Sequence, residues 1–121
     1  MKNFNKKIAK TIKKTGSYLC VGLDTDYKKL PVKTGNINKS IIDFNKNVIN
    51  NTYDLACCYK INSAFYEQYG AKGIEVLKKT IEYINKKDIP VILDAKRCDI
   101  GNTSKCYADF AFKYLNVDAL T

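Results

Sequence analysis

The most constraining stretch of this sequence is an apolar run that ends in closely spaced charges. The run Ile-Pro-Val-Ile-Leu at residues 89–93 is short and rich in β-branched side chains, which predicts a buried strand. Asp94, Lys96 and Asp99 follow at once. Because side chains two residues apart on a strand point to the same side, we expect Asp94 and Lys96 to share a face. Two carboxylates and an ammonium group would thus gather at the C-terminal end of a strand, where α/β folds bind ligands.

Polar side chains also end the two preceding apolar stretches. Asp24 ends the first, and Lys60 and Asn62 lie near the end of the second. A lysine at the end of an apolar strand is costly to bury alone, so Lys60 needs a carboxylate partner, and Asp94 is the natural candidate. The residues alone leave other interpretations open: a turn or helix cap at Asp24, a Lys60 side chain that reaches solvent, and a structural ion pair at Asp94.

Strand and helix patterns alternate along the chain, with no proline- or glycine-rich linker. Apolar side chains at helical spacing predict helices over residues 4–15, 39–51, 67–87 and 102–115. Apolar stretches predict strands over residues 17–24, 55–65, 89–93 and 117–121. We expect the third helix to be interrupted near Gly70 to Gly73, and Asn102 or Thr103 to cap the fourth. The order β-α-β-α-β-α-β after a leading helix predicts a parallel sheet in one α/β domain over residues 1–121.

The composition excludes several classes of site. The 121 residues include no histidine, which rules out His-based catalytic triads and His-ligated metal sites. The five cysteines form no Cys-x-x-Cys motif, which argues against a disulfide framework or a zinc site and indicates a reduced, cytoplasmic protein. Three of them, Cys20, Cys57 and Cys58, are expected in the core. Because no apolar run approaches about 18 residues and no secretory signal is evident, we expect no membrane partner.

The net charge of +9 has more than one interpretation. Nucleic-acid binding is one of them. The lysines, however, are scattered in pairs rather than gathered in one block, which fits a solvated surface equally well. A basic field would also attract a phosphorylated, anionic substrate. We therefore expect no specific nucleic-acid partner.

Three motifs carry a resemblance to a known family. The sequence Asp-Ala-Lys-Arg-Cys-Asp-Ile-Gly-Asn-Thr at residues 94–103 closely resembles the signature of orotidine 5′-phosphate decarboxylase, in the longer-chain variety of that family. Val-Gly-Leu-Asp at residues 21–24 and Tyr-Lys-Ile-Asn-Ser-Ala-Phe-Tyr-Glu at residues 59–67 also resemble the family. The family usually has glycine where this chain has Cys98. If that position needs a positive φ, the cysteine costs on the order of 1 kcal/mol or more.

The resemblance implies a (β/α)₈ TIM barrel, of which this chain would form the first half and end in the fourth strand. A whole barrel typically needs about 250 residues, and barrel enzymes commonly bind phosphate with the loops after strands seven and eight. We therefore expect the phosphate-binding residues to lie outside these 121 residues.

The resemblance also implies a reaction and a role for each residue. The family converts orotidine 5′-monophosphate to uridine 5′-monophosphate and CO₂, in pyrimidine biosynthesis, with no metal and no organic cofactor. The implied catalytic residues are Lys96, as the proton donor, with Asp94, Lys60 and Asp99. The implied substrate-binding residues are Asp24, Asn62, Ile100 and Thr103. Family members are homodimers with shared sites, so Asp99, Ile100 and Thr103 would serve the partner subunit's site.

Two other hypotheses stay open at this point. One is an inactive or split fragment that needs a C-terminal half, or that binds nucleic acid non-specifically. The other is a related barrel enzyme that acts on sugar phosphates by metal-assisted enediolate chemistry. The Ile-Gly-Asn-Thr continuation at residues 100–103 disfavours this second alternative.

Overall fold

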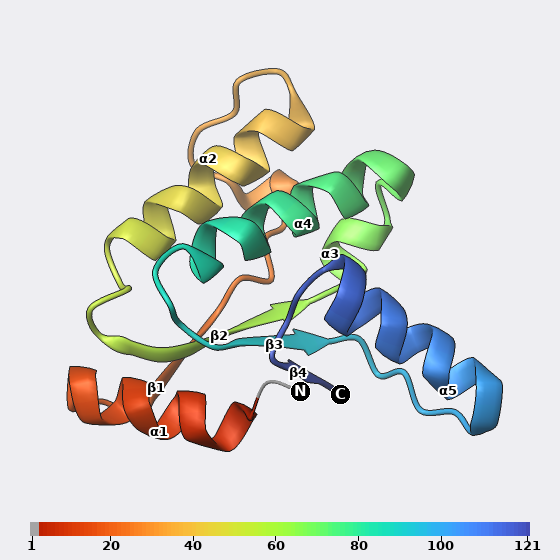
Figure 1. The fold of residues 1–121 in the computed structure, drawn as a ribbon. Coiled ribbons are helices and arrows are strands. Elements are labelled where there is room, and N and C mark those ends of the chain that lie inside the picture. Colours follow the sequence, from red (N-terminus) through yellow and green to blue (C-terminus); the bar gives the residue numbers. More distant parts are fainter. Residues whose placement is uncertain (1–2) are drawn as a thin grey trace.

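The computed structural model describes residues 3–121, which form a parallel sheet flanked by helices (Figure 1). The sheet has the strand order β1-β2-β3-β4, with every neighbouring pair parallel. The strands are β1 (Leu19–Gly22), β2 (Ala56–Asn62), β3 (Val91–Asp94) and β4 (Ala119–Leu120). The helices are α1 (Phe4–Thr15), α2 (Ile37–Asn50), α3 (Ala64–Glu67), α4 (Gly70–Asn85) and α5 (Gly101–Ala108). The predicted alternation and the parallel sheet are confirmed.

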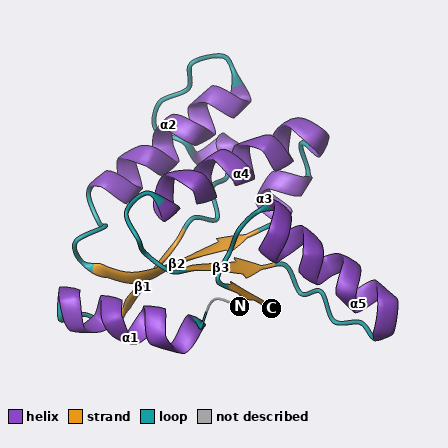
Figure 2. Ribbon diagram, viewed as in Figure 1, coloured by secondary structure: helices purple, strands orange, loops and turns teal. Residues whose placement is uncertain are grey.

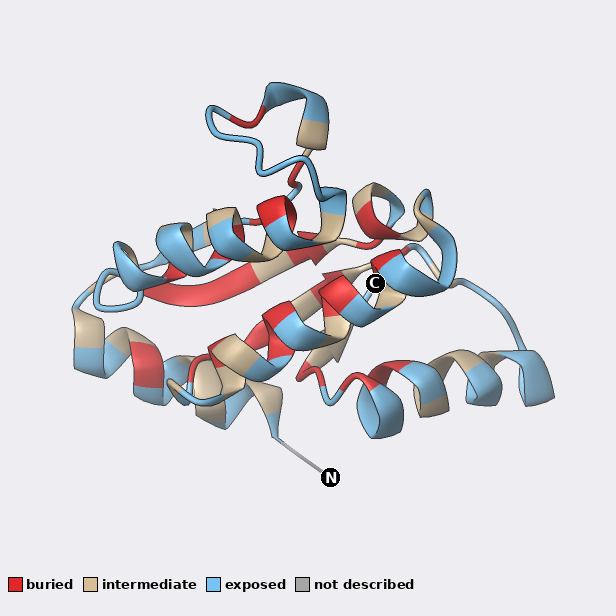
Figure 3. Ribbon diagram, turned by 90° about the horizontal axis from the view of Figure 1, so that it is seen from above, coloured by how far each residue is buried: buried red, intermediate tan, exposed pale blue. Residues whose placement is uncertain are grey.

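The helices divide between the two sides of the sheet. Helices α2 and α4 pack side by side over one side, whereas α1 lies on the other and contacts β2 (Figure 1). The arrows of β2 and β3 point the same way, so their C-terminal ends meet at one edge (Figure 2). The core lies between the sheet and α2 and α4, where buried stretches of strand and helix face one another (Figure 3). Its fully buried side chains include Tyr59, Ile61, Leu77, Ile81, Val91 and Leu93.

The interruption expected near Gly70 to Gly73 lies slightly earlier, at Gln68 and Tyr69 between α3 and α4, and Gly70 to Gly73 form the first turn of α4. Gly70 adopts a φ of 61°, in the left-handed region that glycine tolerates best. A Cβ atom on Gly73 would lie 1.9 Å from the carbonyl oxygen of Tyr66. Only glycine therefore allows the first turn of α4 to approach α3 this closely.

The predicted cap of the last helix is wrong. Helix α5 begins at Gly101, so Asn102 and Thr103 already lie inside it, and Ile100 occupies the N-cap position without a side-chain hydrogen bond. Asp99 does not cap the helix either, because its Oδ1 accepts a hydrogen bond from the adjacent Ile100 N–H. Beyond α5 the chain continues as a π-helical segment, Asp109–Tyr114, which completes the predicted helical stretch.

One of the three cysteines expected in the core is not buried. Cys57 and Cys58 on β2 are buried, as predicted, but Cys20 on β1 is exposed. The reason is topological, because β1 is an edge strand of the four-stranded sheet and most of its residues are exposed. All five cysteines are free thiols.

A buried polar network joins the end of β1 to three helices. Asn45 on α2 is fully buried, accepts a hydrogen bond from Thr25 Oγ1 and donates to Tyr66 Oη at 3.0 Å and to Thr80 Oγ1 at 3.1 Å. Tyr66 Oη in turn donates to the carbonyl oxygen of Leu23 at 2.7 Å. The loop after β1 is thus fixed by buried hydrogen bonds.

Replacing Asn45 tests how much this buried network contributes to the free energy of unfolding. Asn45→Ala removes the acceptor of the buried Thr25 hydroxyl and the amide that donates to Tyr66 and Thr80, and we expect it to lower the free energy of unfolding by about 1–3 kcal/mol. Urea denaturation measures the loss. Asn47→Ala, at an exposed position of the same helix, is the matched control. An equal loss in both variants would mean that the network contributes nothing beyond helix propensity.

Candidate functional site

Three charged side chains, from β2, from β3 and from the loop after β3, meet at the C-terminal edge of the sheet. Asp94, the last residue of β3, accepts a hydrogen bond from Lys60 Nζ on β2 at 3.0 Å and another from Lys96 Nζ at 2.7 Å. The two lysines bind different oxygens of the carboxylate, Oδ2 and Oδ1. The predicted pairing of Lys60 with Asp94 is confirmed. Asp94, Lys60 and Lys96, together with Asp24, are called the charge network below.

Asp24 closes the charge network on the β1 side. Its Oδ2 lies 3.9 Å from Lys60 Nζ, and its Oδ1 accepts a hydrogen bond from the Asn62 backbone N–H at 3.1 Å. The side-chain Oδ1 of Asn62 accepts from the Ala64 N–H, which begins α3. Lys60 therefore lies between two carboxylates, while the side-chain oxygen of Asn62 is engaged in a local turn.

Hydrogen bonds within the network favour the ionised forms of Asp94 and Lys60. The hydrogen bonds from Lys96 and Lys60 lower the pKa of the Asp94 carboxyl from 3.8 to about 2, with a smaller contribution from Thr121. The hydrogen bond to Asp94 raises the pKa of Lys60 above its usual 10.5. The Asp94 side chain is 15% exposed, whereas that of Lys96 is 72% exposed. The network thus presents a charged ammonium group to solvent, anchored on a shielded carboxylate.

Lys96 reaches Asp94 by an unexpected route. Strand β3 ends at Asp94, and Lys96 lies in the following loop with a φ of 54°. That left-handed conformation is uncommon for a residue with a side chain. Cys98 is absent from the non-glycine residues with positive φ in the described range 3–121, so the strain considered for the cysteine does not arise.

The loop after β3 has further anchors that sequence reasoning missed. Arg97 donates from Nη2 to Glu67 Oε1 at 2.6 Å and from Nη1 to the Ala95 carbonyl at 2.9 Å. Its guanidinium lies over the ring of Tyr107, 5.5 Å from the centroid. Thr121, the residue that follows β4, hydrogen bonds to Asp94 and to the Lys96 backbone. No local pattern could have found Thr121, because it meets its partners across two strands.

The other predicted site residues lie apart from the charge network. Asp99, Ile100 and Thr103 are exposed, on the loop before α5 and in its first turn. Ile100 is 86% exposed, an unusual fraction for an isoleucine. The fold therefore brings together Asp24, Lys60, Asn62, Asp94 and Lys96, and leaves the remaining three outside.

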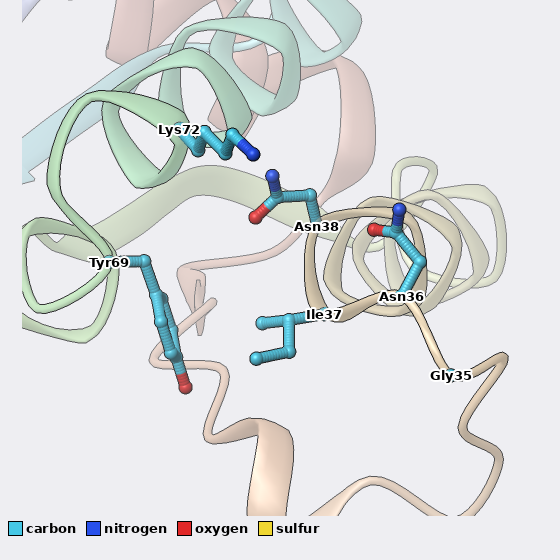
Figure 4. Close-up of a pocket in the computed structure, with 6 residues that line it drawn as sticks. All are labelled: Gly35, Asn36, Ile37, Asn38, Tyr69 and Lys72. Carbon is cyan, nitrogen blue, oxygen red and sulfur yellow. The ribbon is translucent and has the colours of Figure 1, made fainter.

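Two of the pockets near the helices have volumes of about 260 and 380 Å³. One of about 260 Å³ adjoins the charge network through Gly22, Asp24 and Phe65. The other, of about 380 Å³, lies where α2 and α4 begin, and Ile37 and Tyr69 point into the same space while Lys72 approaches Asn38 (Figure 4). This second pocket shares no residue with the network, and two helix starts with an exposed lysine do not by themselves identify a ligand.

Two general features of the described residues bear on binding. Within residues 3–121, no three cysteine, aspartate or glutamate side chains are arranged to hold a metal ion. In the same range, no helix combines the length and apolar character needed to cross a membrane.

Comparison with known proteins assigns the family. The model of the orotidine 5′-phosphate decarboxylase / HUMPS family matches residues 17–121. The chain belongs to this family. Among curated relatives, orotidine 5′-phosphate decarboxylase from Flavobacterium johnsoniae is 51% identical over 107 residues, which cover 87% of this chain and 39% of the relative. The enzyme of that name from Parabacteroides distasonis is 47% identical over 117 residues, which cover 95% of this chain and 42% of the relative. The chain thus spans about two fifths of the length of these relatives.

Solved structures agree with this assignment. The structure of Leishmania donovani OMP decarboxylase is 36% identical with a TM-score of 0.82, over 98% of this chain and 43% of that chain. The crystal structure of Plasmodium berghei orotidine 5′-monophosphate decarboxylase is 29% identical with a TM-score of 0.86, over 98% of this chain and 51% of that chain. The matches confirm the (β/α)₈ TIM-barrel class, of which the described strands form one part.

Acid unfolding tests the ionisation of Asp94 within the network. Because folding lowers the pKa of this carboxyl to about 2, its ionised form stabilises the fold above about pH 4, and that contribution is lost as the pH falls toward 2. The difference in unfolding free energy between wild type and Asp94→Asn should therefore shrink across this range. Urea denaturation at a series of pH values measures it.

The control for this experiment is Asp43→Asn, which makes the same chemical change in an exposed ion pair with Lys39 on α2. A difference between wild type and Asp94→Asn that stays constant down to about pH 2 would contradict the account.

Proposed function

We propose that this chain supplies the catalytic charge network of an orotidine 5′-phosphate decarboxylase, which converts orotidine 5′-monophosphate to uridine 5′-monophosphate and CO₂. The observation that carries the proposal is the chain of contacts Lys60–Asp94–Lys96 at the C-terminal edge of a parallel sheet. That edge is where barrel enzymes place their chemistry. Family membership and relatives bearing the decarboxylase name support the same reaction.

The proposed reaction needs a cation beside the carbon that loses CO₂. As the bond from C6 of the pyrimidine to the carboxylate breaks, its electron pair stays on C6, and Lys96 Nζ transfers a proton to that carbon. Water then returns a proton to Lys96, so the net change consumes one proton and releases CO₂. Since Asp94 and Lys60 already fix the charges in place, little reorganisation accompanies the new charge at C6.

The remaining polar groups of the site would hold the sugar. Asp24 lies on the β1 side of Lys60, with a side chain that is 38% exposed and adjoins the pocket of about 260 Å³. Its carboxylate suits the hydroxyl groups of a ribose, and we assign it to that contact together with Lys60 and Asn62. The phosphate is assigned to residues outside this chain.

The exposed Asp99, Ile100 and Thr103 fit a shared site. All three side chains are exposed, and the apolar side chain of Ile100, 86% exposed, would be covered if another subunit packed against it. We infer that the active form is a homodimer in which these three residues enter the partner's site. Five free thiols also fit a cytoplasmic location.

A chimera tests the reaction, because the chain spans only part of its relatives. Residues 1–121 are joined to the C-terminal part of the Flavobacterium johnsoniae relative, which supplies the rest of the barrel. We expect this chimera to release CO₂ from orotidine 5′-monophosphate. Lys96→Ala should lower kcat by at least about a thousandfold, because both the cation and the proton donor are lost.

The controls are the C-terminal part alone and the unaltered relative. Lys105→Ala, at an exposed position of α5, is the matched lysine control and should keep the activity of the chimera. A folded chimera with full activity after Lys96→Ala would contradict the assignment of Lys96.

Mixing two inactive chimeras tests the shared site. If Asp99 acts in the partner's site, Lys96→Ala and Asp99→Asn each disable both sites of their own homodimer. A mixed dimer then rebuilds one intact site, so subunit exchange should restore about a quarter of the wild-type activity. Steady-state assays before and after mixing measure the recovery. If subunits exchange and no activity returns, Asp99 is not donated across the interface.

A further inference from the structure

Thr121 hydrogen bonds to the end of β3 and to the loop that follows it, through its hydroxyl, its carbonyl and its N–H group. Its hydroxyl donates to Asp94 Oδ1 at 3.0 Å and accepts from the Lys96 backbone N–H at 3.2 Å. Its carbonyl oxygen accepts from the Arg97 N–H at 2.9 Å, and its own N–H donates to the Leu93 carbonyl at 3.1 Å. The last two bonds continue the pairing of β4 with β3, whereas the hydroxyl bonds reach the charge network.

The Thr121 hydroxyl bonds two parts of the charge network at once, the Asp94 carboxylate and the Lys96 backbone. A threonine hydroxyl has one proton to donate, and here that proton goes to the same carboxylate oxygen that Lys96 Nζ binds. One of its lone pairs accepts the amide proton of Lys96 itself. A single side chain therefore holds Asp94 and the main chain of Lys96 at a fixed separation.

The backbone of Lys96 requires such support. Its φ of 54° places a lysine in the left-handed region, which is unfavourable for a residue with a side chain. Strained residues of this kind persist when surrounding contacts determine them, and they concentrate at functional sites. The Thr121 hydroxyl accepts a hydrogen bond from the Lys96 amide, and its carbonyl accepts one from the Arg97 amide. The backbone is therefore held on both sides of the strained residue Lys96.

We propose that Thr121 is a positioning residue of this site: its hydroxyl fixes the Asp94 carboxylate and the strained Lys96 backbone relative to each other, so that the ammonium group is aimed before substrate binds. The proposal deepens the proposed function and rests on it for the identity of the substrate. Thr121 touches no reacting atom in this account and acts only through Asp94 and Lys96.

The test uses the 121-residue chain without substrate. Thr121→Val keeps the shape and the backbone bonds to β3 but removes the hydroxyl, whereas Thr121→Ser keeps the hydroxyl. We expect carbon NMR to show that the Asp94 carboxyl titrates at a higher pH in Thr121→Val than in wild type. Thr121→Ser should titrate as wild type does. The Lys96 amide should exchange with solvent about tenfold faster in Thr121→Val only.

These readouts separate positioning from general support of the fold, since serine restores the hydroxyl but not the methyl group. An unchanged Asp94 titration and an unchanged Lys96 amide in a folded Thr121→Val protein would overturn the proposal, as would a serine variant that behaves like valine. If Thr121→Val does not fold, hydrogen exchange in wild type decides: rapid exchange at the Lys96 amide would overturn the proposal, and protection of that amide would support it. The Asp94 titration and the amide exchange do not depend on decarboxylation. A chimera without activity would therefore contradict the proposed function but not the role of Thr121.

Discussion

The site depends on one carboxylate that accepts hydrogen bonds from two lysines. Asp94 shares Lys60 and Lys96 between its two oxygens, which lowers its pKa to about 2 and raises that of Lys60. Removing either lysine would leave the shielded Asp94 carboxylate without one of its partners. This lowers the free energy of unfolding more than the loss of an exposed ion pair does. The arrangement requires β2 and β3 to be parallel neighbours in this register, with Asn62 opposite Asp94. The sheet therefore serves chiefly to bring these charges to one edge.

The rest of the fold keeps that edge rigid from both flanks. On the β1 side, Asn45 and its buried hydroxyl partners fix the segment that carries Asp24. On the β4 side, the loop containing Lys96 is tied to α3 through Arg97 and to β4 through Thr121. A preorganised site of this kind stabilises developing charge without moving its own groups, which is the most effective electrostatic contribution to catalysis.

Strand periodicity was enough to predict the centre of the site. A lysine at the end of one apolar strand and an aspartate at the end of the next had to meet if the strands were parallel neighbours, and Lys60 and Asp94 do. Lys96 was expected on the same strand face as Asp94, which is wrong, because β3 ends at Asp94 and Lys96 reaches it from the following loop through a positive φ. Thr121 was not predictable, since its contacts depend on the register of β4 against β3 rather than on nearby residues. Cys20 was misplaced because composition does not reveal which strand lies at an edge.

The central claim is that Lys96 faces the carbon at which CO₂ is lost. A crystal structure of the chimeric barrel with bound uridine 5′-monophosphate tests it most directly. The account predicts Lys96 Nζ within about 3.5 Å of C6 of the pyrimidine, still hydrogen bonded to Asp94, with Asp24 against the ribose. A nucleotide bound at this edge of the sheet with C6 turned away from Lys96, or bound elsewhere on the molecule, would contradict it.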